Sequence, residues 1–182
     1  VGLGNPTPDS ENNRHNVGFK IIDAINKKFS LSKQKPKFKG LLTTGKIEGE
    51  KVYAIKPLTF MNNSGICIRE LLEYFKFDAE NVIVFHDDLD VEFGKIKAKF
   101  GGSSAGHNGI ASIDKFIGKD YSRVRVGIGK PKTPIEIGDY VLQNFDQDEL
   151  VGIDKISKNI TESIGDLIEK KLDLFSSTVN NK

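Results

Sequence analysis

The sequence has a single cysteine and no hydrophobic run long enough to cross a bilayer. One cysteine, Cys67, excludes a disulfide within the chain, and this suits a reducing compartment. We therefore expect a cytoplasmic protein without a membrane span. Internal repeats and low-complexity segments are also missing, and 182 residues are enough for one well-buried core but short for two. The sequence predicts one domain over residues 1–182.

Net charge is low as well, at +2, but the charged residues are unevenly distributed along the chain. Residues 20–57 contain ten lysines against three acidic residues, and residues 91–132 contain nine lysines or arginines against three acidic residues. Clustered cations indicate a polyanionic partner if the fold brings them to one face. An ordinary solvated surface is the alternative, above all for residues 33–39, where lysines surround Pro36 and we expect a loop.

The apolar pattern alternates between strand-like and helix-like spacing, which is typical of an α/β protein. The continuous apolar run that ends at Phe85 predicts a buried central strand, and Ser64 predicts the cap of a helix that ends at Phe75. The other expected strands are 1–3, 41–47, 51–56, 95–100 and 122–128, and the other expected helices are 17–29, one that follows Asn108, and one over 148–174.

The chain has only three histidines, and each is followed directly by an amide or a carboxylate. Histidine changes charge near neutral pH, and a carboxylate that orients the ring is the usual way to make it a general base. This pattern is typical of a hydrolytic site. The three runs are Arg14-His15-Asn16, His86-Asp87-Asp88 and Gly106-His107-Asn108-Gly109.

Several of these polar residues fall at the ends of predicted strands. Asn5 follows the first strand, Asn62 comes after the strand that ends at Lys56, and Asp87 closes the central strand. In open α/β sheets, ligands bind outside the carboxyl ends of the strands. We therefore expect these side chains to converge on one site, to which the glycine-rich loop 101–109 adds its histidine and asparagine.

Taken together, the motifs resemble the bacterial-type peptidyl-tRNA hydrolases, in order and spacing and over essentially the whole chain. The resemblance implies a monomeric α/β fold, a single-domain twisted mixed β-sheet flanked by helices on both sides. It also implies hydrolysis of the ester between a peptide and the terminal ribose of tRNA. The motifs are Gly2-Leu3-Gly4-Asn5-Pro6, Arg14-His15-Asn16-Val17-Gly18, Pro57-Leu58-Thr59-Phe60-Met61-Asn62, His86-Asp87-Asp88-Leu89-Asp90, Gly106-His107-Asn108-Gly109 and Arg123-Val124-Arg125-Val126-Gly127-Ile128-Gly129.

An ester to a ribose hydroxyl is an activated acyl group, so a base-activated water is sufficient without a metal, a cofactor or a covalent nucleophile. We predict that His15 is the general base and that Asp87 holds it in the productive tautomer. Amide side chains can stabilise the developing oxyanion, and the resemblance places Asn62 and Asn108 in that role.

The resemblance also assigns residues to the two parts of the substrate. It places Asn5 against the main chain of the peptide. Phe60 and Met61 would form an apolar wall, although such a pair is more often ordinary core packing.

The tRNA phosphates are assigned by the resemblance to Lys97, Lys99 and Arg125. The two lysines alternate with apolar residues, so both point to one side of a strand, and Arg125 belongs to a neighbouring predicted strand. Phosphate contacts position a nucleic acid without reading its sequence, which suits an enzyme that accepts many tRNAs. The alternative is that lysines on an edge strand prevent aggregation.

Three residues depart from the family's usual pattern: Ser10 replaces a tyrosine, Asn13 a threonine and Ala105 a glycine. If the position of Ala105 needs a positive φ, we expect the loop to be strained by about 1 kcal/mol or more.

Two other functions are kept open. One is RNA binding on the same fold without catalysis. The other is a metal-dependent hydrolase built on His86, Asp87, Asp88 and Asp90, which we consider poorly placed because neighbouring residues of a strand point to opposite sides.

Overall fold

A computed structural model describes residues 1–182 and contains six strands and seven α-helices. The strands are β1 (Lys35–Lys37), β2 (Gly40–Ile47), β3 (Glu50–Pro57), β4 (Ile83–Asp88), β5 (Ile96–Phe100) and β6 (Ser122–Gly127). The helices are α1 (Val17–Lys28), α2 (Ser64–Phe75), α3 (Asn108–Ile117), α4 (Ile137–Val141), α5 (Gln147–Glu162), α6 (Ile164–Ile168) and α7 (Leu172–Asn180). None of the helices is long and apolar enough to cross a membrane.

The strands form two three-stranded sheets, which the first residues of the chain join. One sheet is antiparallel, in the order β1-β2-β3, and the other is mixed, in the order β4-β6-β5 with β4 and β6 parallel. The N–H of Gly2 donates to the carbonyl of Ile55 in β3, and the N–H of Leu3 donates to the carbonyl of Phe85 in β4. The α/β class and the mixed pairing are confirmed, with the strands divided between two small sheets.

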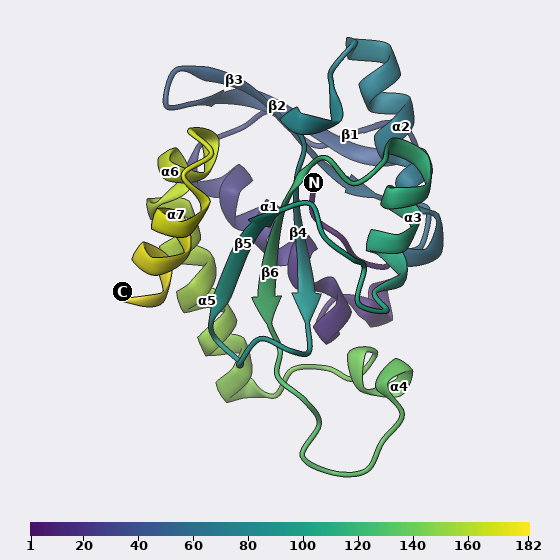
Figure 1. The fold of residues 1–182 in the computed structure, drawn as a ribbon, viewed down its shortest axis with the longest axis vertical. Coiled ribbons are helices and arrows are strands. Elements are labelled where there is room, and N and C mark those ends of the chain that lie inside the picture. The colour runs from purple at the N-terminus through teal and green to yellow at the C-terminus, as the bar shows by residue number, and fades with distance from the viewer.

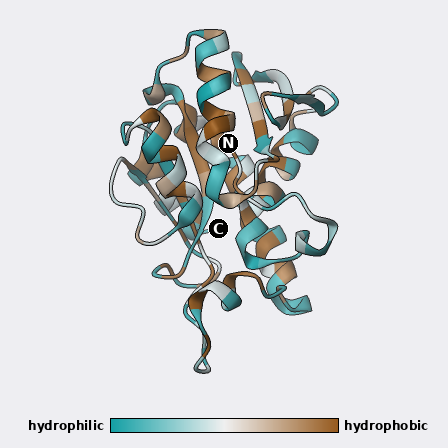
Figure 2. Ribbon diagram, turned by 90° about the vertical axis from the view of Figure 1, so that its right-hand side faces the viewer, coloured by the Kyte–Doolittle hydropathy of each residue, from teal (hydrophilic) through white to brown (hydrophobic).

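Helices cover both faces of the mixed sheet. Successive residues of β4 point to opposite sides, and both faces carry apolar side chains that need to be buried. Phe85 belongs to a core shared with α1 and α5, and Val84 belongs to a second core shared with α2 and α3. Figure 1 shows α2 and α3 together on one side, α5 to α7 on the other, and α4 beyond the tips of the β4 and β6 arrows. The helices carry both hydrophobic and hydrophilic residues, as expected for elements buried on one side (Figure 2).

The C-terminal region differs from the single helix predicted over 148–174. The chain forms α5, α6 and α7 instead, with a left-handed residue, Lys170, between the last two. The turn sends α7 back against β5 and buries Phe175 and Val179 in the core of α1 and α5. Burial of these two side chains therefore overrides the continuous helical pattern.

Two smaller predictions were also wrong. Residues 35–37 form the edge strand β1 rather than a loop, and Pro36 is tolerated there because an edge residue need not donate to a ladder. Ser64 does not cap α2: its hydroxyl donates to the carbonyl of Met61 at 2.9 Å, within a 3₁₀ turn that leads directly into the helix.

Helix α7 covers the open edge of β5. The N–H groups of Ile96 and Ala98 donate to the side chains of Asn180 and Ser176 at 2.9 and 2.8 Å, and the Asn180 amide donates to the carbonyl of Ile96 at 2.9 Å. Side chains thus replace the neighbouring strand that the last strand of a sheet lacks.

Candidate active site

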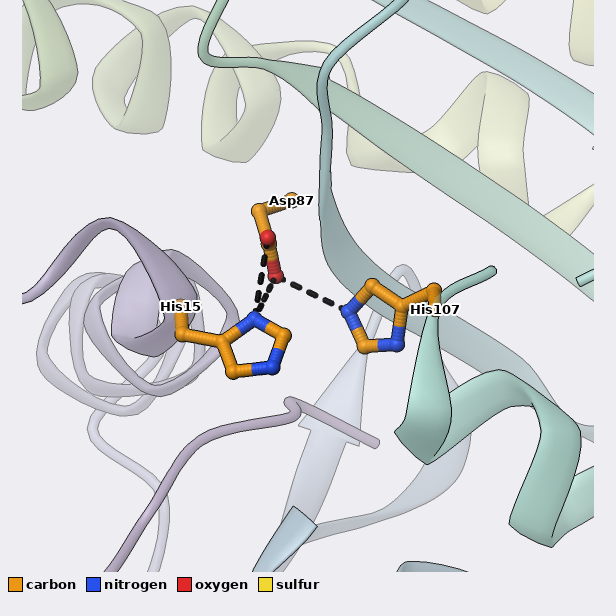
Figure 3. Close-up of side chains that lie close together, drawn as sticks. All are labelled: His15, Asp87 and His107. Atoms are coloured by element: carbon orange, nitrogen blue, oxygen red, sulfur yellow. Dashed lines mark hydrogen bonds and ion pairs between the residues drawn. The ribbon is translucent and has the colours of Figure 1, made fainter. Parts of the chain in front are cut away.

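Asp87 lies between two histidines and accepts a hydrogen bond from each (Figure 3). The Nδ1 atom of His15 is 2.8 and 2.9 Å from the two carboxylate oxygens, and Nε2 of His107 is 2.9 Å from Oδ1. The two rings are tilted against each other with centroids 4.8 Å apart. All three side chains are buried, at 10, 2 and 8% exposure for His15, Asp87 and His107.

Three different elements bring these residues together. His15 lies in a 3₁₀ turn, Arg14–Asn16, that leads into α1, and Asp87 lies near the carboxyl end of β4. His107 is the N-cap of α3, where its Nδ1 accepts from the N–H groups of Gly109 and Ile110. The sequence predicted His15 and Asp87 as a pair, whereas it left His107 without a defined partner.

The hydrogen bonds fix the tautomers of both rings. Nδ1 of His107 accepts from backbone donors, so its proton is on Nε2, which donates to Asp87. His15 donates through Nδ1, which leaves its Nε2 as a free lone pair. A neutral histidine in this tautomer is a general base aimed away from the carboxylate.

Asp87 is ionised in this arrangement. Burial by itself would raise the pKa of this carboxyl, but the adjacent His107 and His15, which also donate hydrogen bonds to it, hold its pKa well below the usual range. A buried carboxylate that accepts from two rings stabilises positive charge on either of them, so it lowers the cost of protonating His15 during a reaction.

One metal site was predicted, on His86, Asp87, Asp88 and Asp90, and the structure adds a second set of possible ligands. The ligating atoms of His15, Asp87 and His107 lie within 4.8 Å of one another, as a metal site requires. The distances of 2.8–2.9 Å are those of hydrogen bonds, however, and each ring nitrogen that faces the carboxylate carries the bonding proton. In the predicted set, Asp88 accepts a hydrogen bond from Arg125 instead.

Asn5 is fixed in position beside the histidine cluster. Its Oδ1 accepts from the N–H of Met61 at 3.0 Å, and the side chain of Asn16 bonds both its N–H and its carbonyl, at 2.8 and 2.9 Å. The amide NH₂ of Asn5 is thereby left as a donor. Asn62 lies in the 3₁₀ turn Met61–Asn63 that precedes α2, Asn108 is the first residue of α3, and both residues are exposed.

The two residues predicted to form an apolar wall differ in exposure. Phe60 is 55% exposed and has a left-handed backbone, with a φ of 57°. Met61 is only 4% exposed and packs beneath Gly109, where a Cβ atom would lie 2.5 Å from its sulfur. Phe60 is therefore available to a ligand, whereas Met61 is buried against the N-terminus of α3.

The three predicted phosphate-binding residues lie on adjacent strands of the mixed sheet. Lys97 of β5 is the direct cross-strand partner of Arg125 in β6, and Lys99 follows on the same side. The Nε of Arg125 is 2.7 Å from a carboxylate oxygen of Asp88, so its charge is partly compensated. Burial of Asp88 opposes ionisation, but the Arg125 hydrogen bond lowers the pKa of this carboxyl.

Each of the three departures from the family pattern has a describable local setting. Ala105 has a φ of 47°, so the strain expected at this position is present in the loop that leads to His107. Ser10 is buried and its hydroxyl bonds that of Thr7 at 2.6 Å. Asn13 forms an isolated bridge with Asn144, which links the segment before His15 to the segment after α4.

Comparison with known proteins gives consistent matches over the whole chain. A family model described as peptidyl-tRNA hydrolase matches residues 1–182. The chain is 79% identical over 182 residues to a peptidyl-tRNA hydrolase of Pelagibacter ubique, covering 100% of this chain and 98% of that protein. It is 44% identical over 181 residues to one of Ehrlichia canis, covering 100% and 93%. The crystal structure of peptidyl-tRNA hydrolase from Acinetobacter baumannii superposes with a TM-score of 0.91 at 30% identity, covering 99% of this chain and 92% of that one.

Proposed function

Because this chain belongs to the peptidyl-tRNA hydrolase family, we propose that His15 and Asp87 hydrolyse the ester between a peptide and the terminal ribose of tRNA. The protein is an enzyme of this type, and peptidyl-tRNA is its substrate. The observation that supports the chemistry is the hydrogen bond from Nδ1 of His15 to Asp87, which leaves Nε2 free as a base.

The reaction needs only this base and a water molecule. Nε2 of His15 takes a proton from the water as its oxygen bonds to the carbonyl carbon of the ester. The tetrahedral intermediate collapses by breaking the bond to the ribose oxygen, which receives the proton from His15. Asp87 stabilises the imidazolium that exists between these two transfers. The products are a free peptide carboxylate and tRNA.

The amides around the cluster bind the reacting acyl group. The exposed side chains of Asn62 and Asn108 donate to the oxyanion. The fixed NH₂ of Asn5 donates to a carbonyl of the peptide main chain, which an aminoacyl group without a peptide lacks. Phe60 offers an exposed ring to the peptide side chains, with Met61 packed behind it.

The tRNA binds along the face that carries Lys97, Lys99 and Arg125, through its phosphates. Residues 1–182 act as a single domain and as a monomer, without a metal or other cofactor, in the cytoplasm.

The decisive experiment measures release of tRNA from an N-blocked aminoacyl-tRNA in the presence of a chelator, with unblocked aminoacyl-tRNA as the control. We expect cleavage of the blocked ester alone, and His15→Ala to be slower by about 10²-fold or more. Inhibition by the chelator would favour metal-dependent hydrolysis. Salt-dependent tRNA binding without any cleavage would favour a non-catalytic RNA-binding protein.

A further inference from the structure

A small polar cavity of about 20 Å³ lies behind the active site, between β4, β5, β6 and the loop that precedes His107. His86, Lys99, Ser103, Ser104 and Arg123 are among the residues that line it. None of the chemistry proposed above uses His86, although it is next to Asp87 in β4.

His86 is held in a single protonation state. Its ring is buried, and Nδ1 is 2.8 Å from the backbone carbonyl of Asp87, an atom that can only accept. The proton is therefore on Nδ1, and Nε2 is an acceptor that has no hydrogen-bond partner. Burial, together with the nearby His107, lowers the pKa of His86, so the ring stays neutral.

Arg123 supplies the complementary group. Its side chain is 1% exposed, with Nη1 2.8 Å from the carbonyl of Ser103 and Nη2 2.7 Å from the carboxylate of Asp114. Its Nε–H is a buried donor that has no partner. A buried unpaired donor and a buried unpaired acceptor thus belong to two residues that line the same cavity.

A water molecule is the ligand that fits these features. A cavity of about 10–15 Å³ or more holds one water when two to four polar partners surround it. A water at this place accepts from Nε–H of Arg123 and donates to Nε2 of His86, so neither buried polar group is left unsatisfied.

The His86 ring in turn contacts His107. The two rings meet edge to face with centroids 4.9 Å apart, and the other neighbour of His107 is His15, at 4.8 Å. His107 therefore lies between two rings while its Nε2 donates to Asp87. If the His107 ring moved away, Asp87 would accept one hydrogen bond fewer. Its carboxylate would then be less firmly fixed as the partner of His15.

We propose that His86 is a positioning residue for the reaction, held by an ordered water that bridges it to Arg123, and that it acts by keeping His107 on Asp87. This inference rests on the proposed function for its catalytic consequence. Its structural part, the position of the His107 ring on Asp87, is independent of any activity.

The test compares His86→Phe, which keeps a ring but removes both nitrogens, with His86→Gln, whose amide oxygen can accept from the water in place of Nε2. Phe85→Leu is the control for a general loss of stability. Phe85 directly precedes His86 in β4 and packs in the core on the other face of the sheet. We measure kcat and KM for an N-blocked aminoacyl-tRNA and the nitrogen NMR signals of the His107 ring.

For His86→Phe we expect kcat to fall about tenfold with an unchanged KM, since small misplacements of catalytic groups cost this much or more. The Nε2–H of His107 should also lose its hydrogen bond to Asp87, which shifts the Nε2 signal of the ring. His86→Gln should retain most of both properties, and Phe85→Leu should change only the thermal stability.

Three results would overturn the inference: normal kcat and normal His107 signals in His86→Phe, a change confined to KM, or an atomic-resolution map without water beside Nε2 of His86. If the wild-type protein cleaves nothing, the proposed function fails. The His107 signals then still decide whether His86 holds that ring.

Discussion

Arg14 and Glu149 form a mostly buried ion pair that joins the residue before His15 to the start of α5. Nη2 of Arg14 lies 2.9 and 2.7 Å from the two carboxylate oxygens, and Nη1 donates to the carbonyls of Gln143 and Asn144. Glu149 also accepts from the N–H of Asp146, so it closes the capping box of α5. The segment that carries the candidate base is thereby fixed to the C-terminal helices.

Arg14→Met removes the charge and leaves Glu149 without its partner. Because the pair is mostly buried, we expect the free energy of unfolding to fall by about 3 kcal/mol, measured by denaturant titration. Lys130→Met is the matched control, since Lys130 pairs with Asp90 at 3.1 Å on the exposed surface. Equal losses in the two variants would show that burial of the Arg14 pair has no special effect.

Asp87→Asn tests the carboxylate between the two histidines. An amide offers one acceptor and one donor group, so it cannot accept from both rings as the carboxylate does. A ring that turns or changes tautomer to suit the amide would move the free lone pair of His15. We expect kcat to fall by about 10³-fold with little change in KM. Asp90→Asn should keep normal turnover, and a normal rate in Asp87→Asn would contradict the assigned role.

Because the backbone at Ala105 is strained, replacing alanine by glycine should have opposite effects on stability at Ala105 and in a helix. Ala105→Gly should raise the free energy of unfolding by about 1 kcal/mol, because glycine adopts the observed φ of 47° without a steric cost. Ala111→Gly, in the exposed face of α3, should lower it by about 1 kcal/mol. Thermal or denaturant unfolding measures both, and a loss of stability in Ala105→Gly would refute the strain.

Cys67 should be inert in the folded protein. Burial, and to a lesser degree Glu70, raises the pKa of this thiol to about 12, above the value of about 8.5 for an unfolded cysteine. A folded pKa above the unfolded one gives stability that is complete below about pH 8.5 and is lost as the pH rises towards 12.

A thiol reagent at pH 8 should therefore react with Cys67 only after denaturant is added. Cys67→Ala should show a smaller loss of stability than the wild-type protein between about pH 8.5 and 12. Rapid labelling of the native protein would show that the α2 face opens readily.

Lys97 is the exposed member of the basic strand pair and has no carboxylate partner in the structure. Lys97→Gln should weaken binding of different tRNAs to a similar extent and reduce the slope of log affinity against log salt by about 1. Binding titrations at several salt concentrations measure this. Lys76→Gln, at the end of α2, serves as the control, and an unchanged slope in Lys97→Gln would remove Lys97 from the phosphate-binding face.

Local sequence patterns were sufficient for most of the fold. The hairpin of β2 and β3 and the helix α1 match their predicted positions because alternation and helical spacing are properties of short segments. The break between α6 and α7 was missed because it is set by contacts with distant residues. No local signal marks Lys170 as left-handed, and the benefit of the turn is the burial of Phe175 against residues that are far away in the sequence, such as those of α1.

The candidate site shows the same division. His15 and Asp87 were predicted from residue type and resemblance, and the structure brings them into hydrogen-bond contact. The bond between His107 and Asp87 was missed, because His107 was read as a loop residue and its role as the N-cap of α3 depends on where that helix begins. The pairing of Arg125 with Asp88 was missed because the two residues are 37 positions apart in the sequence. They meet only because β4 and β6 pair in the folded sheet.

The contact between α7 and β5 also matters while the chain is being synthesised. Until residues 172–180 have left the ribosome, the outer edge of β5 presents unpaired N–H and C=O groups to other proteins, as does any chain cut short before α7. Such an edge is a template for aggregation during synthesis. Packing of α7 against β5 ends this period of risk.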